Sequence, residues 1–289
     1  MLPPLARRLA ACASAAAATP EARLTLQPGG IAGAVAVTLS RPERKNALGK
    51  DLVGTLERLL DDAAALSPAD ARVLVLHSDV PGVFCAGADL KERRGMRADE
   101  VRAAVGRLRA LTDAVDRLPM PTIAALDGAA LGGGLELALA CDVRVAGPGA
   151  IAALPEVRLG IVPGAGGTQR LSRAVGYARA CELTFTARRV CWREGFKLGL
   201  FAAKADGDDG GAFPAFARAL DMAREVAQGA PVALRAAKAA TRAGALDGLS
   251  LPEGLEAEGR AYDRVLHTAD RVEALRAFAE KRPPVFTGE

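Results

Sequence analysis

Short apolar runs alternate with amphipathic segments along the first two thirds of the chain. The apolar runs are rich in Val, Ile, Leu and Ala, and they lie at residues 34–40, 72–77, 122–126 and 141–146. Amphipathic segments with apolar residues at helical spacing lie at residues 49–66, 98–118 and 133–140. Strands that are apolar on both faces and alternate with helices predict a largely parallel sheet covered by helices, which is an α/β fold.

From about Gly167 onward the pattern becomes almost entirely helical. Residues 206–211 form a polar, glycine-rich stretch, and helical periodicity then continues almost to the end of the chain. We therefore divide the chain into a leader (1–20), an α/β core (21–205) and a C-terminal helical region (206–289). A helical section that follows an α/β core favours a role in oligomerisation.

The leader is basic. It contains Arg7 and Arg8 together with Ala and Ser but no acid, which is typical of a mitochondrial presequence. A secretory signal and a cytoplasmic protein with a disordered tail remain alternatives. Without these two arginines, the 38 basic residues fall to 36 against 34 acidic ones, so the charge gives no argument for nucleic-acid binding. No run approaches the roughly 20 apolar residues of a membrane span.

Three glycine-rich stretches and two glutamates fall in the middle of the chain. The stretches are residues 84–90 (FCAGADL), 131–136 (LGGGLE) and 163–170 (PGAGGTQR). Glycine permits turns that are closed to other residues, and the N–H groups that open a helix have no partner within it. Glu136 lies in an apolar helical segment, where it is either a functional acid or a carboxylate that caps the helix or pairs with an arginine. Glu156 follows Pro155 in a loop, where an exposed acid without a special role is the common case.

These motifs resemble those of the enoyl-CoA hydratase/isomerase (crotonase) family. The resemblance extends from Arg41 and Pro42 to the Lys-Arg-Pro-Pro run at 281–284. It is closest to a mitochondrial subgroup that contains methylglutaconyl-CoA hydratase, which is also an AU-rich-element RNA-binding homologue, and enoyl-CoA hydratase domain-containing protein 2. The resemblance implies a spiral of β-β-α units with a C-terminal helical region that assembles a homotrimer, or a hexamer made of two trimers.

The resemblance also implies an activity, the reversible syn addition of water across the double bond of a 2-enoyl-CoA thioester. The backbone amides of Ala88 and Gly133 would form the oxyanion hole for the thioester oxygen. Glu136 and Glu156 match the two acids of the family's hydratases. We expect Glu136 to activate the water and Glu156 to exchange the proton at C2, with the backbone near Gly164 holding the water. The pair favours hydration, while an enoyl-CoA isomerase and an RNA-binding, non-catalytic homologue remain alternatives.

The expected substrate carries its own coenzyme A, so we expect no separate cofactor. By resemblance, the residues that border CoA are Lys45, Ala47, Leu48, Ala86, Asp89, Leu90, Lys91, Phe278 and Lys281. The last two resemble residues that often reach the CoA site of a neighbouring subunit, and any single lysine is more commonly a solvated surface charge. Short-chain enoyl-CoA and 3-methylglutaconyl-CoA are both open as substrates, in fatty-acid or leucine breakdown in the mitochondrial matrix. The five cysteines and two histidines show no metal-binding spacing, so no metal is expected.

Two departures from the subgroup bear on the partner and the substrate. The segment that is lysine-rich in the RNA-binding relative, 50–66, here holds two cations, Lys50 and Arg58, against the acids Asp51, Glu57, Asp61 and Asp62. Phosphate binding depends on such cations, so nucleic acid is not expected as a partner. The second departure is Pro155 before Glu156, where the subgroup more often lacks the proline. Arg158 lies two residues beyond Glu156, where it can face a substrate carboxylate or form a surface ion pair. The sequence leaves both roles of Arg158 open.

Overall fold

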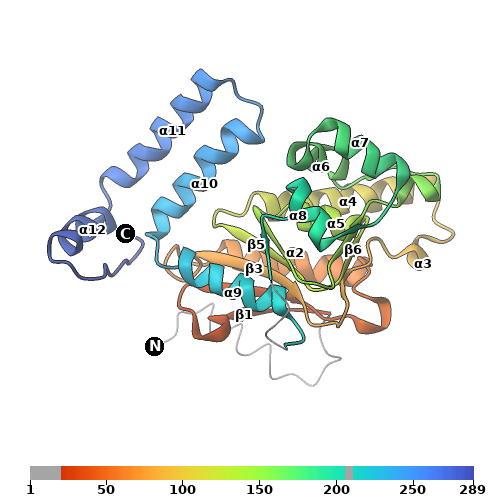
Figure 1. Ribbon diagram of the computed structural model, residues 1–289, viewed down its shortest axis with the longest axis horizontal. Coiled ribbons are helices and arrows are strands. Elements are labelled where there is room, and N and C mark those ends of the chain that lie inside the picture. Colours follow the sequence, from red (N-terminus) through yellow and green to blue (C-terminus); the bar gives the residue numbers. More distant parts are fainter. Residues whose placement is uncertain (1–20, 206–210) are drawn as a thin grey trace.

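The computed structural model describes residues 21–205 and 211–289 (Figure 1). The leader (1–20) and the greater part of the polar stretch 206–211, both assigned above from the sequence, lie outside the described residues. Within the two described ranges, no helix combines the length and the apolar character that are needed to cross a membrane.

The larger of two β-sheets has six strands in the order β1-β2-β3-β5-β7-β10. Its strands are β1 (Ala22–Leu26), β2 (Ala34–Leu39), β3 (Val73–Ser78), β5 (Thr122–Leu126), β7 (Val143–Ala146) and β10 (Ala203–Lys204). Neighbouring strands from β2 to β10 pair in parallel, and β1 runs antiparallel to β2. Every residue of β2, β3 and β5 is buried. The predicted strands with two apolar faces and the predicted largely parallel sheet are therefore confirmed.

A smaller sheet of four short strands contacts the first sheet through β4. Its strands are β4 (Val83–Cys85), β6 (Ala129–Leu131), β8 (Ile151–Ala153) and β9 (Val190–Cys191). Strands β4, β6 and β8 pair in parallel, so their carboxyl ends lie at one edge. Strands of two or three residues are too short to produce a periodic pattern, so the hydrophobic pattern alone did not predict this sheet, although the β-β-α units implied by the resemblance require it.

Three β-β-α units produce this arrangement. In each unit the first strand enters the larger sheet, the second enters the smaller sheet, and a helix follows. The units are β3-β4-α4, β5-β6-α5 and β7-β8-α6, with helices α4 (Ala98–Asp116), α5 (Gly133–Leu139) and α6 (Gly167–Val175). A short helix, α3 (Leu90–Arg93), precedes α4, and a 3₁₀ turn, η3 (Glu156–Leu159), precedes α6. The turns after β4, β6 and β8 thus meet at one edge of the smaller sheet.

Helices cover both faces of the larger sheet. In β3, Leu74 and Leu76 enter the core shared with α2 (Lys50–Ala64), whereas Val73 and Val75 enter a second core beneath α9 (Pro214–Val226). This alternation follows the two-residue period of a strand. The remaining elements before α10 are the helices α7 (Tyr177–Thr186) and α8 (Trp192–Leu198) and the turns η1 (Pro28–Gly30) and η2 (Pro42–Arg44).

The last three helices project from the core (Figure 1). Helices α10 (Pro231–Ala245) and α11 (Leu251–Leu266) pack against each other, and α12 (Ala269–Ala279) lies at the opposite end of the molecule from α3 (Figure 1). Large apolar side chains stay exposed on α11 and α12, namely Leu251, Leu255, Tyr262, Val272, Leu275 and Phe278. This surface therefore leaves much apolar area in contact with water.

Candidate active site

A cavity of about 200 Å³ lies where the turns after β4, β6 and β8 meet the first half of α4. Ligands of open α/β sheets commonly bind beyond the carboxyl ends of parallel strands. Most of the described residues that line the cavity are apolar, and its charged groups are Glu136, Glu156 and Arg93. A larger cavity of about 470 Å³ lies against α10, but its carboxylates, Asp116 and Asp142, are ion-paired. The smaller cavity is therefore the better candidate for acid–base chemistry.

Two glycine turns bring a pair of free amides together at this cavity. Gly87 has a φ of +91°, and a Cβ placed on it would lie 2.6 Å from the carbonyl oxygen of Leu131 and 3.2 Å from the amide nitrogen of Gly133. The turns after β4 and β6 are thus in contact, and only glycine fits at position 87. Among the described residues, the amides of Ala88 and Gly133 donate to no other group. Two free, adjacent N–H groups are the donors that an oxyanion hole needs.

Glu136 is held in the cavity by a loop that lies far along the chain. The side chain is 3% exposed, and its Oε1 accepts hydrogen bonds from the amides of Ala165 and Gly167, both at 2.8 Å. Burial raises the pKa of Glu136, while the two amides and the charges of Arg170 and Arg109 act in the opposite direction. These two hydrogen bonds hold Oε1, and no described group donates a hydrogen bond to Oε2.

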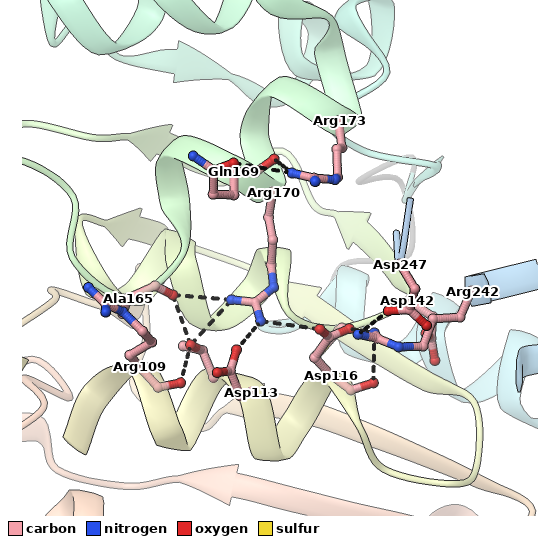
Figure 2. A network of polar contacts seen from close by, with 12 residues as sticks. Arg109, Asp113, Asp116, Asp142, Ala165, Gln169, Arg170, Arg173, Arg242 and Asp247 are labelled. Atoms are coloured by element: carbon pink, nitrogen blue, oxygen red, sulfur yellow. Dashed lines mark hydrogen bonds and ion pairs between the residues drawn. The ribbon is translucent and has the colours of Figure 1, made fainter. Parts of the chain in front are cut away.

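A polar network fixes the loop that holds Glu136 (Figure 2). The carbonyl of Ala165 accepts hydrogen bonds from Thr112 Oγ1 at 2.8 Å and from Arg170 Nη1 at 3.2 Å. Arg170 also pairs with the carboxylate of Asp116 at 3.2 Å, and Asp116 in turn pairs with Arg242 of α10. The network therefore connects α4, α6 and α10 to the amides that orient the Glu136 carboxylate.

Glu156 lies in a different environment, at the first position of η3. It is 8% exposed, and its Oε2 has no hydrogen-bond partner among the described residues. A Cβ placed on Gly132 would lie 2.9 Å from Glu156 Oε1, so the glycine turn leaves room for this carboxylate. Burial raises the pKa of Glu156 to about 7, and the charge of Glu136 adds to the rise. Glu136 receives hydrogen bonds from two amides of another loop, whereas Glu156 receives one from its own backbone, so the pKa of about 7 leaves Glu156 partly protonated near neutral pH.

The cavity brings together part of the predicted site. The predicted residues that line it are Ala86, Ala88, Leu90, Gly133, Glu136, Glu156 and Gly164. Two backbone hydrogen bonds join the predicted CoA-binding residues 45–48 to the turn after β4. Leu48 N–H donates to the Gly87 carbonyl at 2.7 Å, and Ala86 N–H donates to the Lys45 carbonyl at 3.0 Å. The side chain of Lys45 is exposed and Ala47 is buried.

The other predicted CoA residues lie apart from the cavity. Asp89 is 4% exposed, pairs with Arg41 at 3.3 Å and caps α3, so its carboxylate fixes the turn. Lys91 is exposed on α3. Phe278 is 86% exposed on α12, and Lys281 follows that helix. Helix α12 lies at the opposite end of the molecule from α3, so neither residue borders the cavity of its own chain (Figure 1).

Sequence reasoning missed two features of the site. It did not assign the amides of Ala165 and Gly167 to Glu136, although the glycine run at 163–170 marked the loop. It did not single out Arg93, which lines the cavity beside Glu136. Arg158, for which two roles were open, donates to the carbonyl of Thr186 at 3.0 Å and is not among the residues that line the cavity.

Comparisons with known proteins agree with this geometry. Residues 30–289 match a family model described as enoyl-CoA hydratase/isomerase. The chain is 46% identical to methylglutaconyl-CoA hydratase, mitochondrial, of Rattus norvegicus over 257 residues, which cover 89% of this chain and 80% of the relative. It is 44% identical to enoyl-CoA hydratase domain-containing protein 2, mitochondrial, of Homo sapiens over 288 residues, 98% of this chain and 95% of the relative.

A solved structure shares the whole fold. The crystal structure of enoyl-CoA hydratase from Bacillus anthracis superposes with a TM-score of 0.86 at 40% sequence identity. The match covers 93% of this chain and 100% of that chain. The similarity therefore includes the two sheets, the turns that form the cavity and the greater part of the C-terminal helical region.

Proposed function

Because the chain belongs to the enoyl-CoA hydratase/isomerase family, we propose that it is an enoyl-CoA hydratase, a hydro-lyase whose active site is the cavity that holds Glu136 and Glu156. The family and the crotonase-type α/β fold expected from the sequence are confirmed by the family model and by the solved hydratase structure. The observation that carries the proposal is the pair of buried carboxylates in one cavity, next to two free backbone amides.

Each group has a defined part in the reaction. The thioester carbonyl oxygen accepts hydrogen bonds from the amides of Ala88 and Gly133, which stabilise the negative charge that develops there; one such donor contributes about 3 kcal/mol in acyl-transfer enzymes. Glu136 takes a proton from a water molecule as the oxygen of that water attacks C3 of the enoyl group. Glu156 gives its proton to C2. Water is thereby added as OH and H, and the carboxylate pair keeps one proton in total.

This shared proton predicts the pH dependence of the reaction. The pKa of Glu156 is raised to about 7 by burial, so the pair loses its proton above that pH. We expect kcat/KM for crotonyl-CoA to fall about tenfold per pH unit above roughly pH 7. Dehydration of 3-hydroxybutyryl-CoA must show the same decline, because the overall reaction releases no proton. A profile that stays flat to about pH 9 in both directions would contradict the assigned proton.

Loss of the ultraviolet enoyl-thioester band tests the activity itself. Crotonyl-CoA and 3-methylglutaconyl-CoA are offered in parallel to the purified chain, since relatives are named for enoyl-CoA and for methylglutaconyl-CoA. The proposal predicts loss of the band with at least one of the two. Binding of both thioesters without loss of either band would contradict the proposed hydratase activity.

The exposed surface of α11 and α12 supports an oligomer. Enzymes of this family act on CoA thioesters and are typically oligomeric. We infer a homotrimer, alone or as half of a hexamer, in which the apolar surface is covered and Phe278 and Lys281 border the CoA site of a neighbouring copy. Sedimentation equilibrium should therefore give three or six times the chain mass of 29.8 kDa. A species of 29.8 kDa at micromolar concentration would contradict this assembly.

The two relatives described above, from Rattus norvegicus and Homo sapiens, are both named mitochondrial. Together with the basic, acid-free leader, these names support import into the mitochondrial matrix. The cation-poor helix α2 gives no support to an RNA-binding role.

A further inference from the structure

Arg93 brings a positive charge to a cavity whose chemistry, as described above, does not use one. It is the last residue of α3 and is half-buried. Among the described residues that line the cavity, it is the one basic side chain. Its neighbours on the same wall are the apolar side chains of Leu90, Val101 and Val105. A guanidinium beside such a wall loses hydration and gains nothing from the wall in return.

The guanidinium of Arg93 has no hydrogen-bond or ion-pair partner among the described residues. The nearby acids of the α3 segment are already engaged, since Asp89 pairs with Arg41 and caps α3, and Glu92 accepts from the Lys50 amide at 2.8 Å. Burial lowers the pKa of Arg93, and the charge of Glu136 acts against that change. The Arg93 guanidinium is therefore a partly desolvated cation that feels the charge of Glu136 but forms no hydrogen bond or contact ion pair with any described residue.

Other arginines around the site show what a satisfied guanidinium looks like here. Arg109 donates to the Gly164 carbonyl at 3.0 Å, and Arg170 pairs with Asp113 at 2.6 Å (Figure 2). Both act on the protein's own groups. Arg93 differs from them because it lines the cavity and no described carbonyl or carboxylate pairs with its guanidinium.

We propose that Arg93 binds a carboxylate at the distal end of the acyl chain, so that the preferred substrate is a 2-enoyl-CoA with an acidic tail. The proposal rests on the proposed function, which places the thioester oxygen at Ala88 and Gly133 and the double bond between Glu136 and Glu156. A cavity of about 200 Å³ holds an acyl group but not the phosphates of CoA as well. An anion that reaches Arg93 from this cavity belongs to the acyl chain, and a guanidinium–carboxylate pair is short and strong.

Arg93 also lines a neighbouring cavity of about 340 Å³ beside Leu48 and Lys50, so the phosphates of CoA are the competing anion. Thioesters that share CoA and differ only in the acyl tail separate the two.

The test compares the affinity for two saturated thioesters that cannot be hydrated, glutaryl-CoA and butyryl-CoA, by titration calorimetry. The wild-type chain should bind glutaryl-CoA more tightly. In Arg93→Met this preference should fall at least tenfold, which is the order expected when a charged hydrogen bond is removed. Arg93→Lys keeps the charge without the planar fork and should retain part of the preference.

The matched control is Arg94→Met. Arg94 is the exposed next residue, it is outside the cavity lining, and its removal deletes the same charge. The preference for glutaryl-CoA should be unchanged in this variant. If the wild type does not prefer glutaryl-CoA, or if Arg93→Met and Arg94→Met reduce the preference equally, the proposal is overturned. Should Arg93→Met fail to fold, Arg93→Lys decides. A preference for glutaryl-CoA that is smaller than in the wild type supports the proposal, and an unchanged preference overturns it.

Hydration assays keep this proposal separate from the proposed function. The ratio of kcat/KM for 3-methylglutaconyl-CoA to that for crotonyl-CoA should fall in Arg93→Met by a similar factor. If the wild type hydrates neither thioester but prefers glutaryl-CoA through Arg93, the proposed function fails and the carboxylate subsite stands. Suppose instead that the wild type hydrates crotonyl-CoA, and that Arg93→Met changes neither the affinity preference for glutaryl-CoA nor the ratio of kcat/KM values. The subsite then fails and the proposed function stands.

Discussion

Glu156→Gln is expected to lower kcat/KM for crotonyl-CoA by roughly 10²–10⁴-fold, the usual contribution of a positioned acid or base. Glutamine keeps the size and shape of the side chain but cannot deliver the proton to C2. Because Glu156 Oε2 has no hydrogen-bond partner among the described residues, the change breaks no polar contact of that oxygen. Affinity for butyryl-CoA should therefore be largely retained, so the loss falls on kcat.

The control for this variant is Asp61→Asn. Asp61 is an exposed carboxylate on α2, away from the residues that line the cavity, and its loss should leave hydration within about threefold of the wild type. Hydration by Glu156→Gln within the same range would remove Glu156 from the mechanism. A loss of butyryl-CoA affinity as large as the loss of kcat/KM would assign Glu156 to binding instead.

Glu136→Gln is expected to cause a loss of similar size, roughly 10²–10⁴-fold in kcat/KM. The amide oxygen of glutamine can still accept the hydrogen bonds from Ala165 and Gly167, so the loop stays in place. The side chain can no longer take a proton from water. Comparison of kcat/KM with the melting temperature separates the loss of this base from damage to the fold.

Glu136→Ala serves as the contrasting variant. It leaves two buried amide donors without an acceptor, and each unsatisfied donor costs about 1–3 kcal/mol. We therefore expect the alanine variant to be inactive and clearly less stable than Glu136→Gln. If Glu136 only holds the loop, the glutamine variant will stay active while the alanine variant loses stability. That outcome would contradict the role of Glu136 as a base.

The fold follows from the sequence where elements are long and patterned. The amphipathic segment at 98–118 is observed as α4 and the apolar run at 122–126 as β5, because periodicity over many residues and burial on both faces leave clear patterns. The smaller sheet could not be predicted from the hydrophobic pattern, since its strands exist through pairing and not through their own sequences. The projection of α10 and α11 from the core also depends on tertiary packing.

The site was predictable only in part for a related reason. The glycine turns and the two glutamates carry local motifs, so Ala88, Gly133, Glu136 and Glu156 could be proposed from the sequence. The contact of Glu136 with the amides of the loop at 163–167 joins distant parts of the chain, and no local pattern encodes it. The different proton affinities of the two glutamates depend on burial, which also requires the fold.

The central claim is that Glu136 and Glu156 add water to an enoyl thioester, and NMR of crotonyl-CoA in deuterated water tests it most directly. We expect the wild-type chain to form 3-hydroxybutyryl-CoA with one deuterium at C2, and Glu156→Gln to form it at least 10²-fold more slowly. Migration of the double bond without a hydroxyl at C3, or a bound thioester that never reacts, would contradict the account.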